Sequence, residues 1–234
     1  MSAVARGARR RLLLLALVAV TPAAALAQRG ADPAINAPFA DPDFALWQRR
    51  FETEGREVFD RRDAIVAAVG ARPGDTVADV GAGSGLFVRL FAPAVRPGGR
   101  VIAVDIAPVF VDNIVRRARA QGLDNITGIV GTATDTRLPE GAVDIVFTSD
   151  AYHHFEQPQA MLASIRRALK PGGRFVVVDF ERIPGTSPAW ILSHLRAGKE
   201  QVIEEIVAAG FRLVEERKLM RENYFLVFAR PSPS

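Results

Sequence analysis

The sequence predicts an α/β fold in which helices cover both faces of a doubly wound, largely parallel sheet. From residue 72 onwards, short β-branched and apolar runs alternate with stretches of helical length, as expected when parallel strands are joined by helices. Pro-Gly or Gly-Gly pairs punctuate these segments at residues 72–75, 96–99 and 170–173. We expect about seven strands, of which one, near the C-terminus, is antiparallel.

The first 27 residues have the three parts of an export signal. A cationic stretch, Arg6–Arg11, precedes an apolar run at 12–20, and Ala25–Ala27 before Gln28 forms a small-x-small cleavage signal. The apolar run is too short to cross a bilayer of about 30 Å comfortably, so a cleaved leader is favoured over a permanent anchor. We therefore expect an exported, periplasmic protein. The alternative is a cytoplasmic or inner-membrane-tethered protein that retains its leader.

Composition excludes several classes of function. The chain of 234 residues is 49% hydrophobic and contains no cysteine, which rules out disulfides, thiolate metal sites and a cysteine nucleophile. Its net charge of +4 equals the four arginines of residues 1–27, where no acid occurs, so the remainder is neutral. Binding of nucleic acid through net charge is therefore disfavoured.

The elements follow in order along the chain. Residues 28–42 are expected to form an extended linker, and residues 43–71 a helical lid that begins at the capping residue Asp43 and carries Phe44, Trp47 and Phe51 at near-helical spacing. Residues 72–230 form the main domain. Its strands are expected at 76–80, 100–105, 126–130, 143–148, 174–179, 211–216 and 224–229, and its helices at 86–95, 108–121, 158–169 and 199–209.

A glycine-rich turn after the first strand is the strongest local motif. Asp79 is followed by Gly81, Gly83 and Gly85 just before a helix, and glycine at such positions lets a ligand approach the backbone. A dinucleotide fingerprint would place its third glycine at position 86, where Leu86 stands. The spacing therefore favours a compact zwitterionic ligand over a pyrophosphate.

An acid ends the second strand. Asp105 follows 24 positions after Gly81, and a carboxylate at the end of this strand can accept both hydroxyls of a ribose. Ile106, directly after it, is placed to lie against a flat adenine ring. Both residues are expected in the crevice at the carboxyl ends of the strands.

Together these motifs resemble class I S-adenosylmethionine-dependent methyltransferases, in the methyltransferase-11 and ubiquinone/menaquinone-biosynthesis branch. The resemblance covers residues 72–180, about half the chain, and rests on these stretches: 79–85, 104–106, 138–139 with 143–146, Tyr152-His153-His154-Phe155 and 169–174. It implies a Rossmann-like fold with S-adenosyl-L-methionine as cofactor.

The resemblance also implies roles for individual residues. The methionine moiety would pass Gly81, Ala82, Gly83 and Gly85, with Asp79 near its ammonium group. Asp105 would hold the ribose, Ile106 would face the adenine, and Thr132 and Ala133 would meet its edge. Relatives often carry an acid where Thr132 stands, so either Thr132 or Asp135 is expected to accept the adenine amino group.

Candidate catalytic residues follow the fourth strand. Asp150, His153 and His154 lie where this family places the methyl acceptor, and either histidine has an ordinary pKa suited to a general base. A metal site formed by these two with His194 is disfavoured, because adjacent histidines do not share a face of a helix. No metal is expected.

The predicted function is methyl transfer to a small or lipophilic acceptor, with possible proximity to a membrane. Two alternatives stay open: a nicotinamide-dependent oxidoreductase, against which Leu86 argues, and a non-catalytic module that binds a nucleoside. The sequence does not indicate the acceptor or the oligomeric state.

Overall fold

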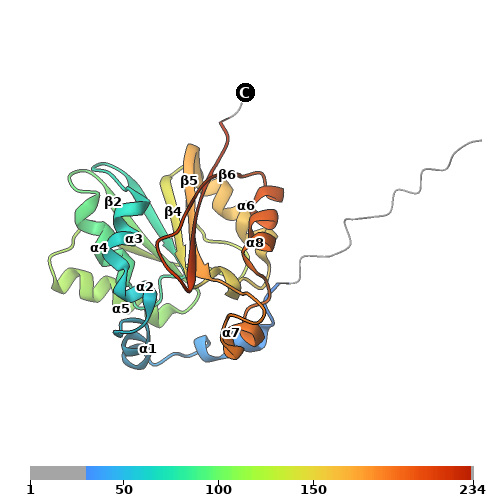
Figure 1. Ribbon diagram of the computed structural model, residues 1–234. Coiled ribbons are helices and arrows are strands. Elements are labelled where there is room, and N and C mark those ends of the chain that lie inside the picture. The colour runs from blue at the N-terminus through green and yellow to red at the C-terminus, as the bar shows by residue number, and fades with distance from the viewer. Residues whose placement is uncertain (1–29, 233–234) are drawn as a thin grey trace, which may run out of the picture.

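The computed structural model describes residues 30–232, so the leader expected at 1–27 lies outside the described residues. A seven-stranded sheet runs through the centre of the molecule (Figure 1). Its strands are β1 (Thr76–Val80), β2 (Arg100–Asp105), β3 (Ile126–Val130), β4 (Val143–Ser149), β5 (Leu169–Phe180), β6 (Arg212–Arg217) and β7 (Asn223–Ala229).

The strand order is β3-β2-β1-β4-β5-β7-β6. Strands β1 to β5 pair in parallel, whereas β7 is antiparallel to both β5 and β6. The predicted fold class, with one antiparallel strand near the C-terminus, is therefore confirmed. The order reverses between β1 and β4, and in open sheets of this kind the crevice at such a switch point is where ligands bind.

Helices cover both faces of the sheet. The N-terminal part contains η2 (Pro33–Phe39), α1 (Phe44–Phe51), α2 (Glu57–Asp60) and α3 (Arg62–Val69). The remaining helices are α4 (Leu86–Ala94), α5 (Pro108–Ala120), η3 (Tyr152–His154), α6 (Pro158–Ala168), α7 (Ala189–His194) and α8 (Lys199–Ala208). Among residues 30–232, none of them is long and apolar enough to cross a membrane.

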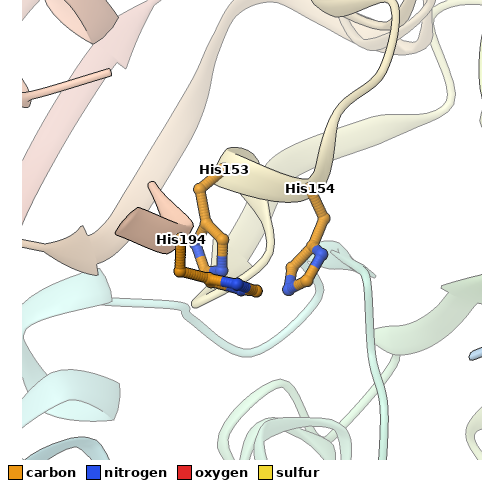
Figure 2. Close-up of side chains that lie close together, drawn as sticks. All are labelled: His153, His154 and His194. Carbon is orange, nitrogen blue, oxygen red and sulfur yellow. The ribbon is translucent and has the colours of Figure 1, made fainter. Parts of the chain in front are cut away.

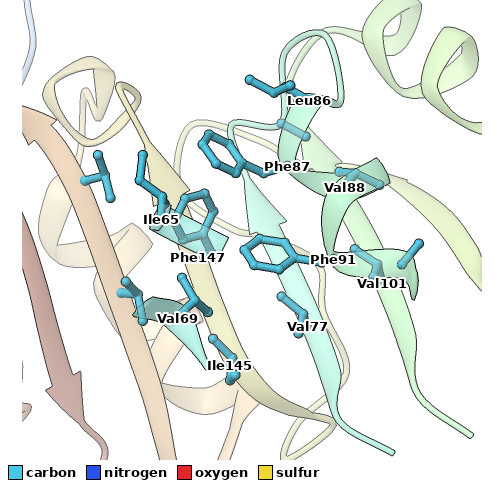
Figure 3. Close-up of a cluster of buried hydrophobic side chains, with 14 of the residues drawn as sticks. Ile65, Val69, Val77, Leu86, Phe87, Val88, Phe91, Val101, Ile145 and Phe147 are labelled. Carbon is cyan, nitrogen blue, oxygen red and sulfur yellow. The ribbon is translucent and has the colours of Figure 1, made fainter. Parts of the chain in front are cut away.

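The core has two layers because successive residues of a buried strand face opposite sides of the sheet. Val77 packs in the layer with α3, α4 and α5, while its neighbour Ala78 packs in the layer with α6 and α8. Figure 3 shows the first layer, in which Phe87 and Phe91 of α4 lie 4.8 and 5.2 Å from Phe147 of β4, ring centre to ring centre. This packing holds α4, and with it the preceding glycine turn, against the sheet.

Several elements differ from the sequence-based expectation, which includes neither η3 nor α7. Residues 33–39 of the expected extended linker form a 3-10 helix, because Asp32 accepts a hydrogen bond from the Ala34 N–H and Pro33 supplies a helical φ. Strand β5 begins at Leu169 rather than at 174, since Leu169 already pairs with Val143 before a register shift. Helix α1 of the lid begins at the predicted cap, where Asp43 accepts from the Leu46 N–H at 2.8 Å.

Candidate cofactor and acceptor site

A cavity lies at the carboxyl ends of β1, β2 and β4, at the switch point of the sheet. The predicted site residues that line it are Asp79, Gly81, Ala82, Gly83, Asp105, Ile106, Thr132, Ala133, Asp150 and His154. Two predicted site residues, Gly85 and His153, do not line it. The sequence motifs therefore converge on one crevice, with these two exceptions.

The glycines of the turn are required mainly by the protein itself. Gly81, Gly83 and Gly85 have φ values of +78°, +53° and +78°, a region that residues with side chains seldom adopt. A Cβ on Gly81 would lie 2.5 Å from the Ala151 Cβ. Backbone conformation and neighbouring protein atoms therefore require glycine here, in addition to the room for a ligand that the sequence predicts.

Gly85 lies outside the cavity lining, and its predicted contact with the cofactor stays a prediction. It is the residue before α4, and a Cβ there would lie 2.7 Å from Ile114 of α5. Its role is to let α4 and α5 approach each other beneath the site.

Four of the five N–H groups of residues 81–85 have acceptors within the protein. Gly81 and Ala82 donate to the Val104 carbonyl at 2.8 and 3.1 Å, Gly83 donates to Asp105, and Gly85 donates to Ala82. In a phosphate-binding loop these groups would point at the ligand. With four of these groups engaged, the turn differs from a phosphate-binding loop, which is consistent with the sequence-based argument against a pyrophosphate ligand.

Asp105 joins the turn to the end of β2. One carboxylate oxygen accepts from the Gly83 N–H at 2.9 Å, and the other accepts from the Ala107 N–H at 3.0 Å. A carboxylate can accept about four hydrogen bonds, so each oxygen retains a lone pair for one hydroxyl of a ribose. Burial raises the pKa of Asp105, and the backbone hydrogen bonds oppose that rise.

Asp79, at the end of β1, is almost completely buried, with 3% of its surface exposed. Burial, and secondarily the nearby charge of Asp105, raises its pKa to about 8. A cationic group entering the cavity would favour the ionised carboxylate and offset this cost. Asp79 is thus suited to an ammonium group.

The part of the cavity lined by Ile106 and residues 131–133 suits a flat ring. Ile106 presents an apolar side chain that is 46% exposed, and Gly131, Thr132 and Ala133 form the adjacent wall. Thr132 Oγ1 accepts from the Asp135 N–H at 2.9 Å. Asp135 is itself held by Ser164 and Arg167 at 3.0 and 3.1 Å. Both candidates for the adenine amino group therefore lie at the cavity, and the choice between them stays a prediction.

Asp150 follows β4 in a positive-φ conformation of +47°, which is uncommon for a residue other than glycine. Its carboxylate accepts from Arg56 on one oxygen and from Asn223 Nδ2, at 2.7 Å, on the other. Burial raises its pKa to about 6, although Arg56 acts in the opposite direction. Both carboxylate oxygens are therefore engaged by protein groups. Asp150 holds Arg56 of the lid in place, and it also lines the cavity.

The two candidate histidines have different surroundings. His153 is buried and its Nδ1 lies 2.7 Å from Asp179 Oδ1; burial opposes protonation, but this carboxylate outweighs burial and raises the pKa. His154 faces the cavity, and burial, with the nearby His153 and His194, lowers its pKa to about 3. That makes His154 a weak base. A catalytic role for either histidine stays a prediction.

Several residues of the site were missed from sequence. Arg56 of the lid, and Asn36 and Phe39 of η2, line the cavity although they precede the main domain. Ser149, the last residue of β4, also lines it, and its buried Oγ has no hydrogen-bond partner among residues 30–232. The position of Ser149 at a strand end was a usable signal. The other three depend on contacts between distant segments.

These features fit S-adenosylmethionine. The cavity offers a carboxyl group for an ammonium, a carboxylate with free lone pairs for a ribose, an exposed apolar side chain for adenine and an unpaired hydroxyl. Its remaining wall is rich in apolar side chains from Phe39, Phe51, Phe87, Phe110, Phe155 and Met161. Fold and site together define a nucleoside-binding domain of the doubly wound α/β class.

Comparison with known proteins agrees with this. Residues 78–177 match the family described as a methyltransferase domain. Over 147 residues the chain is 33% identical to nocamycin O-methyltransferase of Saccharothrix syringae, covering 62% of this chain and 52% of that protein. It is 32% identical over 132 residues to a ubiquinone/menaquinone biosynthesis C-methyltransferase of Caulobacter vibrioides, covering 54% and 52%.

A solved structure shows the same fold. The S-adenosylmethionine-dependent methyltransferase from Aquifex aeolicus aligns with a TM-score of 0.71 at 21% identity, covering 81% of this chain and all of that one. The chain spans about half the length of the curated relatives that it matches. It contains a class I S-adenosylmethionine-dependent methyltransferase domain, the family whose cofactor is S-adenosyl-L-methionine.

Proposed function

We propose that this protein transfers the methyl group of S-adenosylmethionine to a small, lipophilic acceptor. The observation that carries the proposal is the pair of acids, Asp79 and Asp105, on one wall of the cavity. Asp79 can give up its proton to pair with the ammonium group of a cationic ligand, and the Asp105 carboxylate can accept ribose hydroxyls. A nicotinamide dinucleotide has a ribose for Asp105 but offers no ammonium to Asp79.

The acceptor is proposed to enter on the apolar side of the cavity. Methyl transfer from a sulfonium needs mainly the alignment of nucleophile, methyl carbon and sulfur, so the protein contributes position and exclusion of water. Phe39 and Phe51, which the N-terminal segments bring over the cavity, provide the apolar cover. The names of the two relatives, one a nocamycin O-methyltransferase and the other a C-methyltransferase of ubiquinone/menaquinone biosynthesis, support a small-molecule acceptor.

The proposal is tested by calorimetry with S-adenosylmethionine, S-adenosylhomocysteine and NADH. We expect one site for the first two ligands and none for NADH. Asp105→Asn should weaken both by about 10- to 100-fold, because a charged hydrogen-bond acceptor is lost. The control is Asp112→Asn on the exposed face of α5. Unchanged binding by Asp105→Asn would contradict the ribose contact.

Catalysis is tested separately. S-adenosylhomocysteine release should be measured with a panel of quinols, phenols and other apolar hydroxyl compounds. Turnover with at least one of them is expected. Binding of the cofactor without turnover on any acceptor would instead favour the non-catalytic nucleoside-binding module.

A further inference from the structure

All three histidines of the chain converge on one point. His153 and His154 come from η3, and His194 comes from the end of α7, forty residues away (Figure 2). The ring centres lie 4.2 Å apart for His153 and His154, and 5.2 and 5.3 Å from these two to His194. One ligating nitrogen of each lies within 4.8 Å of the others.

The reason for expecting no metal here was wrong. Adjacent histidines point apart on an α-helix, but His153 and His154 lie in a short 3-10 turn between β4 and α6. The turn brings their rings close together, and the insert after β5 adds the third ring from the side.

Hydrogen bonds fix the orientation of two of the rings. His153 Nδ1 lies 2.7 Å from a carboxylate oxygen of Asp179, which can only accept. His154 Nδ1 lies 2.7 Å from Asn36 Oδ1, and the amide is oriented because Asn36 Nδ2 donates to Glu156 and to the His154 carbonyl. Each Nδ1 therefore carries the hydrogen, which leaves the Nε2 lone pair free. Metal-binding histidines typically have such partners.

We propose that His153, His154 and His194 bind one divalent transition-metal ion, with zinc as the best match. Imidazole nitrogens suit zinc, and three protein ligands with an open fourth position are typical of a catalytic zinc site. Zinc–nitrogen bonds of about 2.0–2.1 Å place tetrahedral ligands about 3.4 Å apart. The ligand atoms lie within 4.8 Å of one another, so metal binding would draw the rings together, with His194, whose ring makes no hydrogen bond among residues 30–232, free to move most. Asp179, behind His153, supplies the nearby negative charge.

The role of the metal, though not its binding, rests on the proposed function. His154 lines the cavity whereas His153 and His194 do not, so the metal would lie at the edge of the cavity, beside the side proposed for the acceptor. The metal would hold a hydroxyl or carbonyl oxygen of the acceptor. An oxygen-bearing acceptor is therefore the substrate class that this arrangement selects. A histidine with Nδ1 hydrogen-bonded and Nε2 on a metal has no lone pair left for proton transfer, so the histidines would hold the metal instead of acting as bases.

The test is zinc binding by protein purified without a polyhistidine tag and treated with a chelator. Titration in competition with a chromophoric chelator should show one zinc per chain, and cobalt should give the strong visible absorption of a four-coordinate site. His194→Gln should reduce zinc affinity by at least 100-fold, and Asn36→Ala by about 10- to 100-fold. Ser193→Ala, on the exposed side of α7, should bind zinc as the unmodified protein does.

Two results would overturn the inference: no stoichiometric zinc in the unmodified protein, or equal affinity in His194→Gln. Circular dichroism and thermal unfolding show whether each variant is folded, and His194 is only partly buried at the end of a short helix. S-adenosylmethionine binding is measured on the same metal-free samples. Cofactor binding without zinc binding overturns the metal site alone, whereas zinc binding without cofactor binding overturns the proposed function alone.

Discussion

At the scale of single residues, the cavity is governed by the acids at the ends of β1 and β2. Asp105 has backbone N–H groups on both oxygens, which compensate part of its burial. Asp79 is almost fully buried, and burial followed by the charge of Asp105 raises its pKa to about 8. The cofactor-free protein therefore holds Asp79 protonated at neutral pH, and a cationic ligand must displace that proton.

Asp79→Asn is expected to stabilise the cofactor-free protein at alkaline pH. The folded pKa of about 8 exceeds the ordinary value of 3.8, so the stability that this group contributes is complete below pH 3.8 and is lost as pH rises through 8. One pKa unit corresponds to about 1.4 kcal/mol, which makes the difference on the order of 5 kcal/mol at about pH 9. Urea unfolding at about pH 5 and about pH 9 spans roughly three of these pKa units, so about 4 kcal/mol of the difference should develop between the two.

The same change should weaken S-adenosylmethionine binding by about 10- to 100-fold, because it removes a charge-assisted hydrogen bond. Asp112→Asn serves as the control for both measurements. A free-energy difference between variant and unmodified protein that does not change with pH would show that Asp79 is already ionised without ligand.

At the scale of elements, the site is completed by segments that precede the main domain. Arg56, between α1 and α2, pairs with Asp150 and donates to the Phe51 carbonyl, and Arg89 of α4 contacts Glu52 at 2.8 Å. These contacts place Phe51 over Gly83, where a Cβ would lie 3.1 Å from the ring. The lid predicted at 43–71 is thus held by charges whose partners lie elsewhere in the chain.

Arg56→Gln should loosen this lid. It leaves the buried Asp150 without its cationic partner, and removal of one member of a buried pair costs about 3 kcal/mol. Hydrogen exchange should become faster in residues 43–60 and stay unchanged in the central strands. Arg49→Gln, exposed on α1, is the matched control. Equal exchange in both variants would show that the Arg56–Asp150 pair does not hold the lid.

At the scale of the whole molecule, the N-terminal segment at residues 30–36 packs against residues 154–156 beside the cavity. The Ala31 N–H donates to the Phe155 carbonyl at 2.9 Å, and a Cβ on Gly30 would lie 1.5 Å from the Glu156 carbonyl oxygen. Asn36 contacts His154 and Glu156. Cleavage after Ala27 would leave all of these contacts in place, so the proposed leader and the folded domain are compatible.

We propose that the protein is exported and begins at Gln28 in its mature form. Cell fractionation with N-terminal sequencing tests this, and the expected result is a periplasmic protein that starts with Gln28. A variant with Ala25 and Ala27 replaced by bulky residues should keep its leader, because the cleavage signal requires small side chains. A cytosolic protein that still begins near Met1 would contradict export.

Local patterns in the sequence determined the fold class, the order of strands and helices along the chain, and most of the residues expected to line the cofactor cavity. The reason is that strand periodicity, helix caps and the run from Asp79 to Gly85 act over a few residues, and parallel strands bring their carboxyl ends to one edge. Only the tertiary structure decided which distant residues meet there. Arg56 reaches Asp150, Asn36 reaches His154, and His194 joins the adjacent histidines across separations of 94, 118 and about forty residues. Such contacts depend on how whole elements pack, which no local pattern specifies.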